Sequence, residues 1–229
     1  MDWRAACAAV IPCLNEATAI GPLVGAVQKH VSTVLVVDDG STDQTSSMAR
    51  EAGGIVLQNP RNLGKGAALQ AGWSHVNKLG YAWALTLDGD GQHSPDDIPK
   101  FLHCAEAGAA ALIVGNRMAQ AQRVPPVRRW VNRWMSRRLS LLCGRPLPDS
   151  QCGFRLMKLE AWSRLPVSTT HFEIESEVLF LFATAGLSIE FVPIQVVYKQ
   201  EHSKIHPWPD SIRWLRWYRQ ARRRFVERG

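Results

Sequence analysis

Cysteine is scarce in this 229-residue sequence, and none of its five scattered cysteines form a CxxC pair. That pattern argues against a disulfide framework or a zinc knuckle and favours reduced thiols in the cytosol. The N-terminus lacks a basic segment followed by an apolar one, so we expect no signal peptide. The most apolar segment, residues 177–192, is interrupted by Gly186, Ser188 and Glu190. A membrane-spanning helix needs about 20 apolar residues, so none is expected.

Acidic residues are missing from one long basic segment. Residues 117–145 contain eight arginines and no Asp or Glu, and residues 199–229 contain nine Lys or Arg against three acids. The net charge of +7 is therefore concentrated late in the chain. This distribution predicts an anionic partner, namely a phosphate, an anionic lipid surface or a nucleic acid.

The first half of the chain alternates between apolar runs and helical patterns. Continuous apolar strands separated by helices indicate an α/β fold with a mostly parallel sheet covered on both faces. The expected strands are residues 6–12, 33–40, 54–59, 82–90 and 110–117, and the expected helices are 16–30, 42–53, 64–80 and 94–108. We then expect a helix over 127–144, a loop over 146–158, a helix over 172–186, a strand over 187–199 and a final helix after Pro209.

Polar clusters follow these predicted strands. They are NE at 15–16, DDGS at 38–41, NLGKG at 62–66, DGDGQH at 88–93 and GNR at 115–117. Ligands of parallel α/β sheets bind beyond the carboxyl ends of the strands. We therefore expect the clusters to converge on one edge of the sheet.

Asp88 and Asp90 lie one residue apart where a predicted strand ends, just before Gln92 and His93. A polar turn would explain these residue types, because Asp and Gly are common in turns. Two close carboxylates repel each other, however, and a cation stabilises the ionised pair. Oxygen ligands select Mg²⁺ or Mn²⁺, which keep positions open for phosphate oxygens. The position at a strand end favours the metal site.

Two further clusters suggest nucleotide contacts. Asp38 and Asp39 can accept hydrogen bonds from a base or a ribose, as the acid after a Rossmann strand does. Asp43, or a neighbouring hydroxyl, would cap the next helix. Lys65 follows a glycine-rich turn that opens a helix, which is a weak phosphate signal because the Walker A spacing is missing.

Six motifs together resemble family 2 glycosyltransferases. They are IPCLNE, VVDDGSTDQT, NLGKGAAL, LDGDGQHSP, GNR and DSQCGFR, in that order. More narrowly, residues 8–206 resemble the polyprenyl-phosphate (dolichol-phosphate mannose synthase-like) glycosyltransferases. The resemblance implies the GT-A fold, a UDP- or GDP-sugar donor, a divalent metal ion (Mg²⁺ or Mn²⁺) and inversion at the anomeric carbon.

The resemblance also implies roles for individual residues. It places the metal on Asp90 and Gln92, puts Asp88 nearer the sugar, and brings Arg117 to the diphosphate or the acceptor. Cys13-Leu14 replaces an aromatic residue found in many members, which leaves the base open between uracil and guanine. The implied donor-binding set is Pro12, Asn15, Glu16, Asp38, Asp39, Lys65, Asp88, Gly89 and Asp90.

A phosphate acceptor is consistent with the basic segment. A phosphate monoester has a second pKa of roughly 6 and is already an anion at pH 7, whereas a hydroxyl acceptor needs a general base. Asp149 would position an arginine, or act as the base if the acceptor is a hydroxyl. The candidate catalytic residues are Asp88, Asp90, Arg117, Arg129 and Asp149. The candidate acceptor-binding residues are Arg117, Arg128, Arg129 and Arg133, with Ser203 and Lys204 in a segment that resembles the family's mobile loop.

Two segments allow alternative interpretations. Thr170 and Glu173 fit a capping box, but the resemblance puts residues 172–175 near the sugar, so the roles of Glu173 and Glu175 stay open. In the predicted C-terminal helix, residues 207–229, the side chains of Trp214, Trp217, Tyr218, Ala221 and Phe225 share one side, and Arg213, Arg216, Arg219 and Arg223 share the other. Such a helix can lie in a membrane interface or pack its aromatics on the domain. A lipid acceptor favours the membrane.

The expected protein is thus a GT-A domain (residues 1–206) with a membrane-associating helix, located at the cytoplasmic face of the membrane. It would transfer a sugar from a nucleotide-sugar to a polyprenyl phosphate; a hydroxyl acceptor is the alternative. A nucleic-acid-binding module would explain the basic segments but not the acids at strand ends, so we expect no nucleic-acid partner. The sugar, the lipid length and the oligomeric state stay open.

Overall fold

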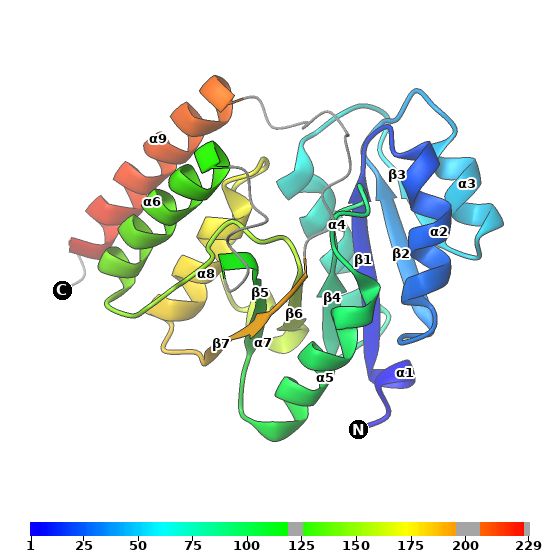
Figure 1. Cartoon of the computed structure of the whole chain (residues 1–229), viewed down its shortest axis with the longest axis horizontal. Coiled ribbons are helices and arrows are strands. Elements are labelled where there is room, and N and C mark those ends of the chain that lie inside the picture. Colours follow the sequence, from blue (N-terminus) through cyan, green and yellow to red (C-terminus); the bar gives the residue numbers. More distant parts are fainter. Residues whose placement is uncertain (119–125, 196–206, 227–229) are drawn as a thin grey trace.

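A seven-stranded mixed sheet organises the computed structural model, which describes residues 1–118, 126–195 and 207–226 (Figure 1). The strand order is β3-β2-β1-β4-β6-β5-β7. All strands run in the same direction except β6, which is antiparallel to β4 and β5. The strands are β1 Cys7–Cys13, β2 Thr33–Asp38, β3 Ile55–Gln58, β4 Trp83–Thr86, β5 Leu112–Asn116, β6 Arg155–Lys158 and β7 Ile189–Pro193.

The buried strands account for the apolar runs in the sequence. Every residue of β1 and β4 is buried, as are five of the six residues of β2. Strands covered on both faces read as continuous hydrophobic segments because neither side meets water. The five strands predicted in the first half of the chain are therefore confirmed. The first is shifted by one residue and the others are shorter, most of all β4, which ends at Thr86 instead of residue 90.

Helices cover both faces of the sheet (Figure 1). They are α1 Trp3–Ala6, α2 Ala17–Val27, α3 Thr45–Glu51, α4 Lys65–Lys78, α5 Ile98–Ala107 after the short 3-10 helix Pro95–Asp97, α6 Pro126–Cys143, α7 Leu159–Ser163, α8 Ile174–Thr184 and α9 Pro207–Val226. Leu69 and Trp73 of α4 meet Ile174 of α8 around a small pocket on one face. Within the described residues, no helix combines the length and apolar character needed to cross a bilayer.

Strand β6 corrects the prediction of a loop over residues 146–158. Arg155 pairs with Thr86 of β4, and Leu156 pairs with Ile113 of β5. A four-residue segment has too few residues to show a strand periodicity, and its pairing with two neighbours supplies the missing stability. Because β6 is antiparallel, its amino end lies where β4 and β5 have their carboxyl ends. Residues 149–154 therefore reach the same edge of the sheet as Asp88.

The predicted capping box is also wrong. Helix α8 begins one residue after Glu173, whose side chain makes no capping hydrogen bond. Glu177, one turn into the helix, instead accepts hydrogen bonds from the N–H groups of Ser168 and Thr169 at 3.0 and 2.8 Å. Their two hydroxyls donate to the same carboxylate. Glu177 thus fixes the loop before α8.

The aromatic side of α9 packs on the domain, so the interpretation that placed this side in a membrane is wrong. Trp214, Trp217 and Ala221 are 2%, 9% and 5% exposed. The indole of Trp214 donates a hydrogen bond to Ser176 Oγ at 2.8 Å, and Trp217 meets Phe180 of α8 edge to face. Helix α9 therefore completes the hydrophobic core over α8.

Replacing Trp214 with Ala should reduce the free energy of unfolding by about 3–5 kcal/mol, because a buried indole leaves a cavity. Arg219→Ala, on the exposed side of the same helix, should change it by less than about 0.5 kcal/mol. Urea unfolding followed by circular dichroism measures both. Equal stabilities of the two variants would show that α9 is not packed on the domain.

Candidate active site

The turns after β1 and β2 are joined by hydrogen bonds. Asn15 N–H donates to Ser41 Oγ at 2.9 Å, and Thr42 N–H donates to Asn15 Oδ1 at 2.8 Å. Glu16 N–H donates to Thr45 Oγ1 at 2.7 Å. These contacts place Asn15 and Glu16 beyond the carboxyl end of β1, where the sequence predicts the donor site.

Asp38 and Asp39 are buried and hold the surrounding loops. Asp39 accepts hydrogen bonds from the N–H groups of Leu63 and Gly64 at 3.0 and 2.8 Å. Asp38 accepts one from the N–H of Ser41 at 2.8 Å. Both carboxylates are thus used to fix the turns that follow β2 and β3, and their contact with a nucleotide stays a prediction.

The glycine-rich turn before α4 is covered by the loop that precedes α8. Gly64 has φ +100°, which L side chains rarely adopt, and a Cβ there would lie 2.4 Å from the carbonyl oxygen of Thr170. A Cβ on Gly66 would lie 2.6 Å from the carbonyl oxygen of Thr169. Only glycine allows this close approach, and it brings the start of α4 with Lys65 against α8.

Lys65 bridges two acids from distant parts of the chain. Its Nζ lies 2.6 Å from Asp88 Oδ1 and 2.6 Å from Glu175 Oε1. The side chains of Lys65, Asp88 and Glu175 are 15%, 27% and 6% exposed. The ammonium group is therefore already shared between two carboxylates, and its direct contact with a phosphate stays a prediction.

The two acids of the predicted metal motif differ in their electrostatic environment. Burial disfavours the charged form of Asp88, but Lys65, His93 and Arg117 together outweigh this effect and lower the pKa of Asp88 to about 2, with Lys65 contributing most. Burial raises the pKa of Asp90, and the negative charge of Asp88 raises it further. The negative charge of Asp88 is thus balanced by Lys65, whereas ionised Asp90 would be stabilised by a further cation nearby.

Asp90 and Gln92 carry oxygen donors suited to Mg²⁺ or Mn²⁺. Asp90 Oδ1 accepts a hydrogen bond from Gln92 N–H at 2.9 Å, which brings the two residues into one tight turn. Within the part of the chain that the structure describes, no group of three His, Cys, Asp or Glu side chains could hold a metal. A cation at Asp90 would therefore need substrate oxygens and water for most of its ligands, an arrangement that is common for Mg²⁺.

Asp88 fits a close-packed space formed by the segment before β6. A Cβ on Gly153 would lie 2.6 Å from Asp88 Oδ1, so any larger residue would push the carboxylate away. On the other side, the backbone N–H of Asp88 points to His93 Nδ1 at 3.4 Å. Burial lowers the pKa of His93, whose ring packs on Phe154 with 5.3 Å between centroids. A neutral His93 can accept this hydrogen bond.

Gly89, between the two acids, packs on the end of β1. A Cβ there would lie 2.4 Å from Cys13 Sγ and 3.1 Å from the carbonyl oxygen of Pro12. Cys13 is 3% exposed. Cys13, the first residue of the Cys13-Leu14 pair, is therefore a buried thiol that packs against the turn carrying the acid pair.

Arg117 and Asp149 form a two-pronged ion pair. Arg117 Nε and Nη2 donate to the two carboxylate oxygens of Asp149 at 2.8 Å each, and the backbone N–H of Arg117 donates at 3.0 Å. Asp149 is fully buried. The positive charge of Arg117 also lowers the pKa of Asp88, by less than Lys65 and His93 do. Asp149 thus holds Arg117 in place, and the part that either residue takes in catalysis stays a prediction.

Of the other predicted acceptor-binding residues, the structure describes the side chains of Arg129 and Arg133, and both lie on α6. Arg129 is half-buried on α6, and Arg133 is exposed on the same helix. The side chain of Arg128 and the residues Ser203 and Lys204 lie outside the described part of the chain. Their roles stay predictions.

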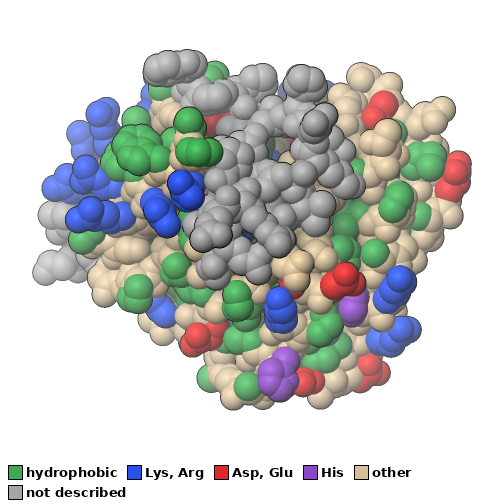
Figure 2. All heavy atoms as spheres, in the orientation of Figure 1, with side chains coloured by type: hydrophobic (Ala, Val, Ile, Leu, Met, Phe, Trp, Pro, Cys, Tyr) green, Lys and Arg blue, Asp and Glu red, His purple; other side chains and the backbone are tan. Residues whose placement is uncertain are grey.

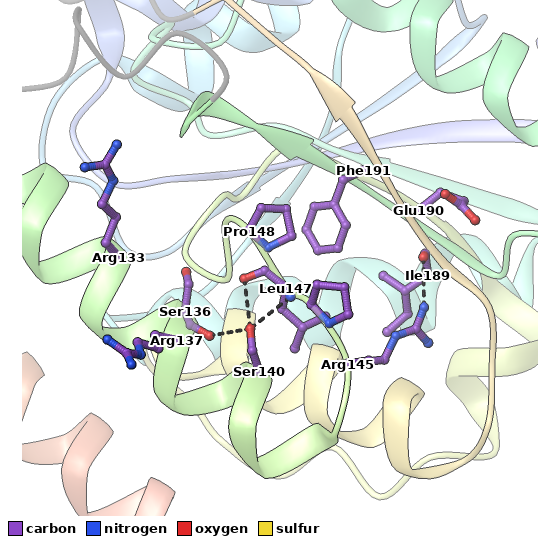
Figure 3. Close-up of a pocket in the computed structure, with 11 residues that line it drawn as sticks. Arg133, Ser136, Arg137, Ser140, Arg145, Leu147, Pro148, Ile189, Glu190 and Phe191 are labelled. Carbon is purple, nitrogen blue, oxygen red and sulfur yellow. Dashed lines mark hydrogen bonds between the residues drawn. The ribbon is translucent and has the colours of Figure 1, made fainter.

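Arg133 borders an open pocket of about 700 Å³ between α6, the loop at 145–148 and the first half of β7 (Figure 3). Arg145 donates to the carbonyl oxygens of Leu187 and Ile189 at 3.2 and 3.1 Å. Ser140 Oγ accepts from Leu147 N–H at 2.9 Å. These polar groups hold the loop to β7 and α6, so we assign the pocket no catalytic role.

Sequence reasoning missed the ion pair between Lys65 and Glu175 and the role of Gly153. The signals for Glu175 were an acid within the apolar pattern of α8 and the resemblance that puts residues 172–175 near the sugar, and neither indicated Lys65 as its partner. The sequence pattern also indicated no role for Arg155. This residue is 4% exposed and donates a hydrogen bond from Nε to the carbonyl oxygen of Cys152 at 2.8 Å. The contacts of Gly153 and Arg155 depend on β6, which the sequence pattern did not predict.

The chain matches the model of the family described as "Glycosyl transferase family 2" over residues 8–165. This match covers most of the sequence, and the chain therefore belongs to that family and is a hexosyltransferase. The expected family and enzyme class are thus confirmed.

Relatives and solved structures agree with this assignment. The chain is 29% identical to a UDP-N-acetylglucosamine–dolichyl-phosphate N-acetylglucosaminyltransferase of Methanococcus voltae, over 83% of this chain and 85% of the relative. It is 29% identical to a polyprenol monophosphomannose synthase of Mycolicibacterium smegmatis, over 81% and 75%. The fold matches glucosyl-3-phosphoglycerate synthase of Mycobacterium tuberculosis, crystallised with Mn²⁺, UDP-glucose and phosphoglyceric acid, with a TM-score of 0.72 and 20% identity over 94% of this chain and 77% of that chain. The expected GT-A fold is confirmed.

Replacing Lys65 with Met should lower the free energy of unfolding by about 3 kcal/mol, because it leaves buried carboxylates without a counter-charge. Adding Glu175→Gln should recover part of this loss, since one unpaired anion is then removed. Urea unfolding tests both, and Lys78→Met on the exposed end of α4 is the matched control. A Lys65 variant as stable as the control would contradict the bridging role.

Proposed function

We propose that this enzyme transfers a sugar from a nucleotide diphosphate-sugar to the phosphate of a polyprenyl phosphate, with inversion at the anomeric carbon and with Mg²⁺ or Mn²⁺. The main support is the unequal acid pair at the sheet edge, with Asp88 compensated by Lys65 and Asp90 not compensated. The names of the two relatives given above support a lipid-linked phosphate as the acceptor.

The residues would divide the work of sugar transfer. Asp90 and Gln92 would hold the cation, which when bound neutralises charge on the departing diphosphate. Lys65 keeps Asp88 ionised, so that this carboxylate can face the positive charge that develops on the sugar ring. Asp149 holds the guanidinium of Arg117 in a fixed orientation near the acids, where it can bind a phosphate of donor or acceptor.

The hydrogen bonds of Asp149 also favour a phosphate acceptor over a hydroxyl acceptor. Both of its oxygens accept hydrogen bonds from Arg117, so this carboxylate is poorly placed to remove a proton. A phosphate oxygen needs no general base, because the second pKa of a phosphate monoester is roughly 6 and the group is ionised at neutral pH. Cations that bind the acceptor then matter more than a base.

A hydroxyl acceptor is the second candidate, and one observation favours it. Glu173 Oε2 is buried and has no hydrogen-bond partner among the described residues. A carboxylate in this state, just before α8, could serve as a general base. Glucosyl-3-phosphoglycerate synthase, whose fold this chain shares, is named for a product that joins a sugar to a phosphorylated acid.

Replacing Asp90 with Asn should abolish the Mn²⁺-dependent part of nucleotide-sugar binding and reduce turnover by at least about 100-fold, as expected when a charge-stabilising group is lost. Calorimetric titration of UDP- and GDP-sugars with and without Mn²⁺ measures the binding. Asp96→Asn, at an exposed acid six residues later, should leave both quantities unchanged. Metal-dependent binding that survives in the Asp90 variant would exclude this metal site.

Glu173→Gln separates the two acceptors. With a phosphate acceptor, turnover should fall by less than about tenfold, whereas loss of a general base would reduce it by about 10²–10⁴-fold. The lipid product should release its sugar in mild acid, as a glycosyl phosphate does. A large loss of activity, together with an acid-stable product, would establish the hydroxyl acceptor instead.

A further inference from the structure

Helices α6 and α9 form a parallel pair on the outside of the domain (Figure 1). Trp134 packs on Trp214 with 5.6 Å between ring centroids, and one turn later Tyr218 Oη donates to the carbonyl oxygen of Arg138 at 3.2 Å. The sequence separation is 80 residues at both contacts, so the two helices run in the same direction. We call the outward sides of this pair the α6–α9 surface.

The α6–α9 surface carries an excess of basic charge among the residues that the structure describes. The two helices contain eleven arginines, and their only acid, Asp210, is 8% exposed and paired with Arg213. The arginines classed as exposed are Arg133, Arg137, Arg138, Arg216, Arg219, Arg222, Arg223 and Arg224. A surface with this one-sided charge complements an anionic partner.

Exposed apolar residues lie on the same surface. Val127 and Trp130 at the start of α6 are 77% and 69% exposed, and Ile212 near the start of α9 is 46% exposed. Leu141, three turns further along α6, is 68% exposed. Figure 2 shows hydrophobic side chains beside Lys and Arg side chains over this corner of the molecule.

The starts of both helices lie on the same side of the molecule as the carboxyl ends of the parallel strands (Figure 1). Val127, Trp130 and Ile212 therefore point away from the core at the end nearest the candidate active site. This arrangement differs from the helix predicted from sequence, because the aromatic side of α9 is buried and the opposite side is free to bind.

We propose that the α6–α9 surface docks on an anionic lipid bilayer. The arginines would bind the headgroups, and Val127, Trp130 and Ile212 would enter the interface between headgroups and acyl chains. A lipid surface fits better than a nucleic acid, because exposed Val and Ile gain nothing from a phosphate backbone but are buried by acyl chains. A second copy of the same surface would be repelled by its like charge. The inference deepens the proposed function. It rests on that function in one respect, since docking brings the enzyme to its acceptor only if the acceptor is a lipid-linked phosphate.

Sedimentation with vesicles tests the docking without any turnover. The full chain should pellet with vesicles of phosphatidylcholine and phosphatidylglycerol, less so at high salt, and remain in solution with phosphatidylcholine alone. Arg216→Glu combined with Arg219→Glu should weaken partitioning by at least about tenfold, since each basic residue near the surface contributes about fivefold. Val127→Glu combined with Trp130→Glu should also weaken it by at least about tenfold, because the apolar contact is lost.

Two control variants carry the same chemical changes elsewhere. Arg50→Glu with Lys78→Glu reverses two exposed charges, and Leu79→Glu replaces a side chain that is 58% exposed. Both should pellet like the unmodified chain. Circular dichroism and melting temperature must show that every variant is folded. The proposal is overturned if the controls lose vesicle binding as much as the surface variants do, or if the surface variants keep it. It is also overturned if the surface variants lose binding to an oligonucleotide, or lose self-association, while their vesicle binding is unchanged.

Activity assays distinguish this proposal from the proposed function. The surface variants should keep turnover on a short, water-soluble polyprenyl phosphate and lose at least about tenfold on a long-chain acceptor in anionic vesicles. Absence of transfer to either acceptor, with vesicle binding intact, would reject the polyprenyl-phosphate function alone. Equal turnover of all variants on both acceptors would reject the role of docking in catalysis.

Discussion

The ammonium group of Lys65 is the interaction on which the candidate site depends. It joins the start of α4, the end of β4 and the start of α8 through Asp88 and Glu175, at 2.6 Å from each. One cation between two carboxylates favours the ionised form of Asp88 in a partly buried place where an isolated anion would be less stable. The same arrangement leaves Asp90 without comparable compensation, which makes that position favourable for a metal ion.

The direction of a single short strand determines what surrounds this cation. Because β6 is antiparallel between β4 and β5, the segment before it returns to the edge where the parallel strands end. Gly153 then leaves just enough room for the carboxylate of Asp88, and Asp149 is placed to hold Arg117. A parallel strand at this position would have carried these residues to the opposite edge of the sheet.

The arginines of the basic segments have separate tasks. Arg117 is held by Asp149 at the site, and Arg145 binds backbone carbonyls that connect its loop to β7. Those of α6 and α9 that are exposed form the α6–α9 surface, where no acid opposes them within the described residues. Counting charges along the sequence could not separate these groups, since a paired arginine and a solvated arginine each carry the same formal charge.

The sequence by itself determined the order of strands and helices in the first half of the chain, the convergence of the polar clusters on one edge, and the family. These features are local: continuous apolar runs mark buried strands, and the motifs follow them within a few residues. Only the tertiary structure decided that residues 155–158 form a strand, that Lys65 pairs with Glu175, and which side of α9 is buried. Each of these depends on contacts between segments about 40 to 110 residues apart along the chain, and no local periodicity records such contacts.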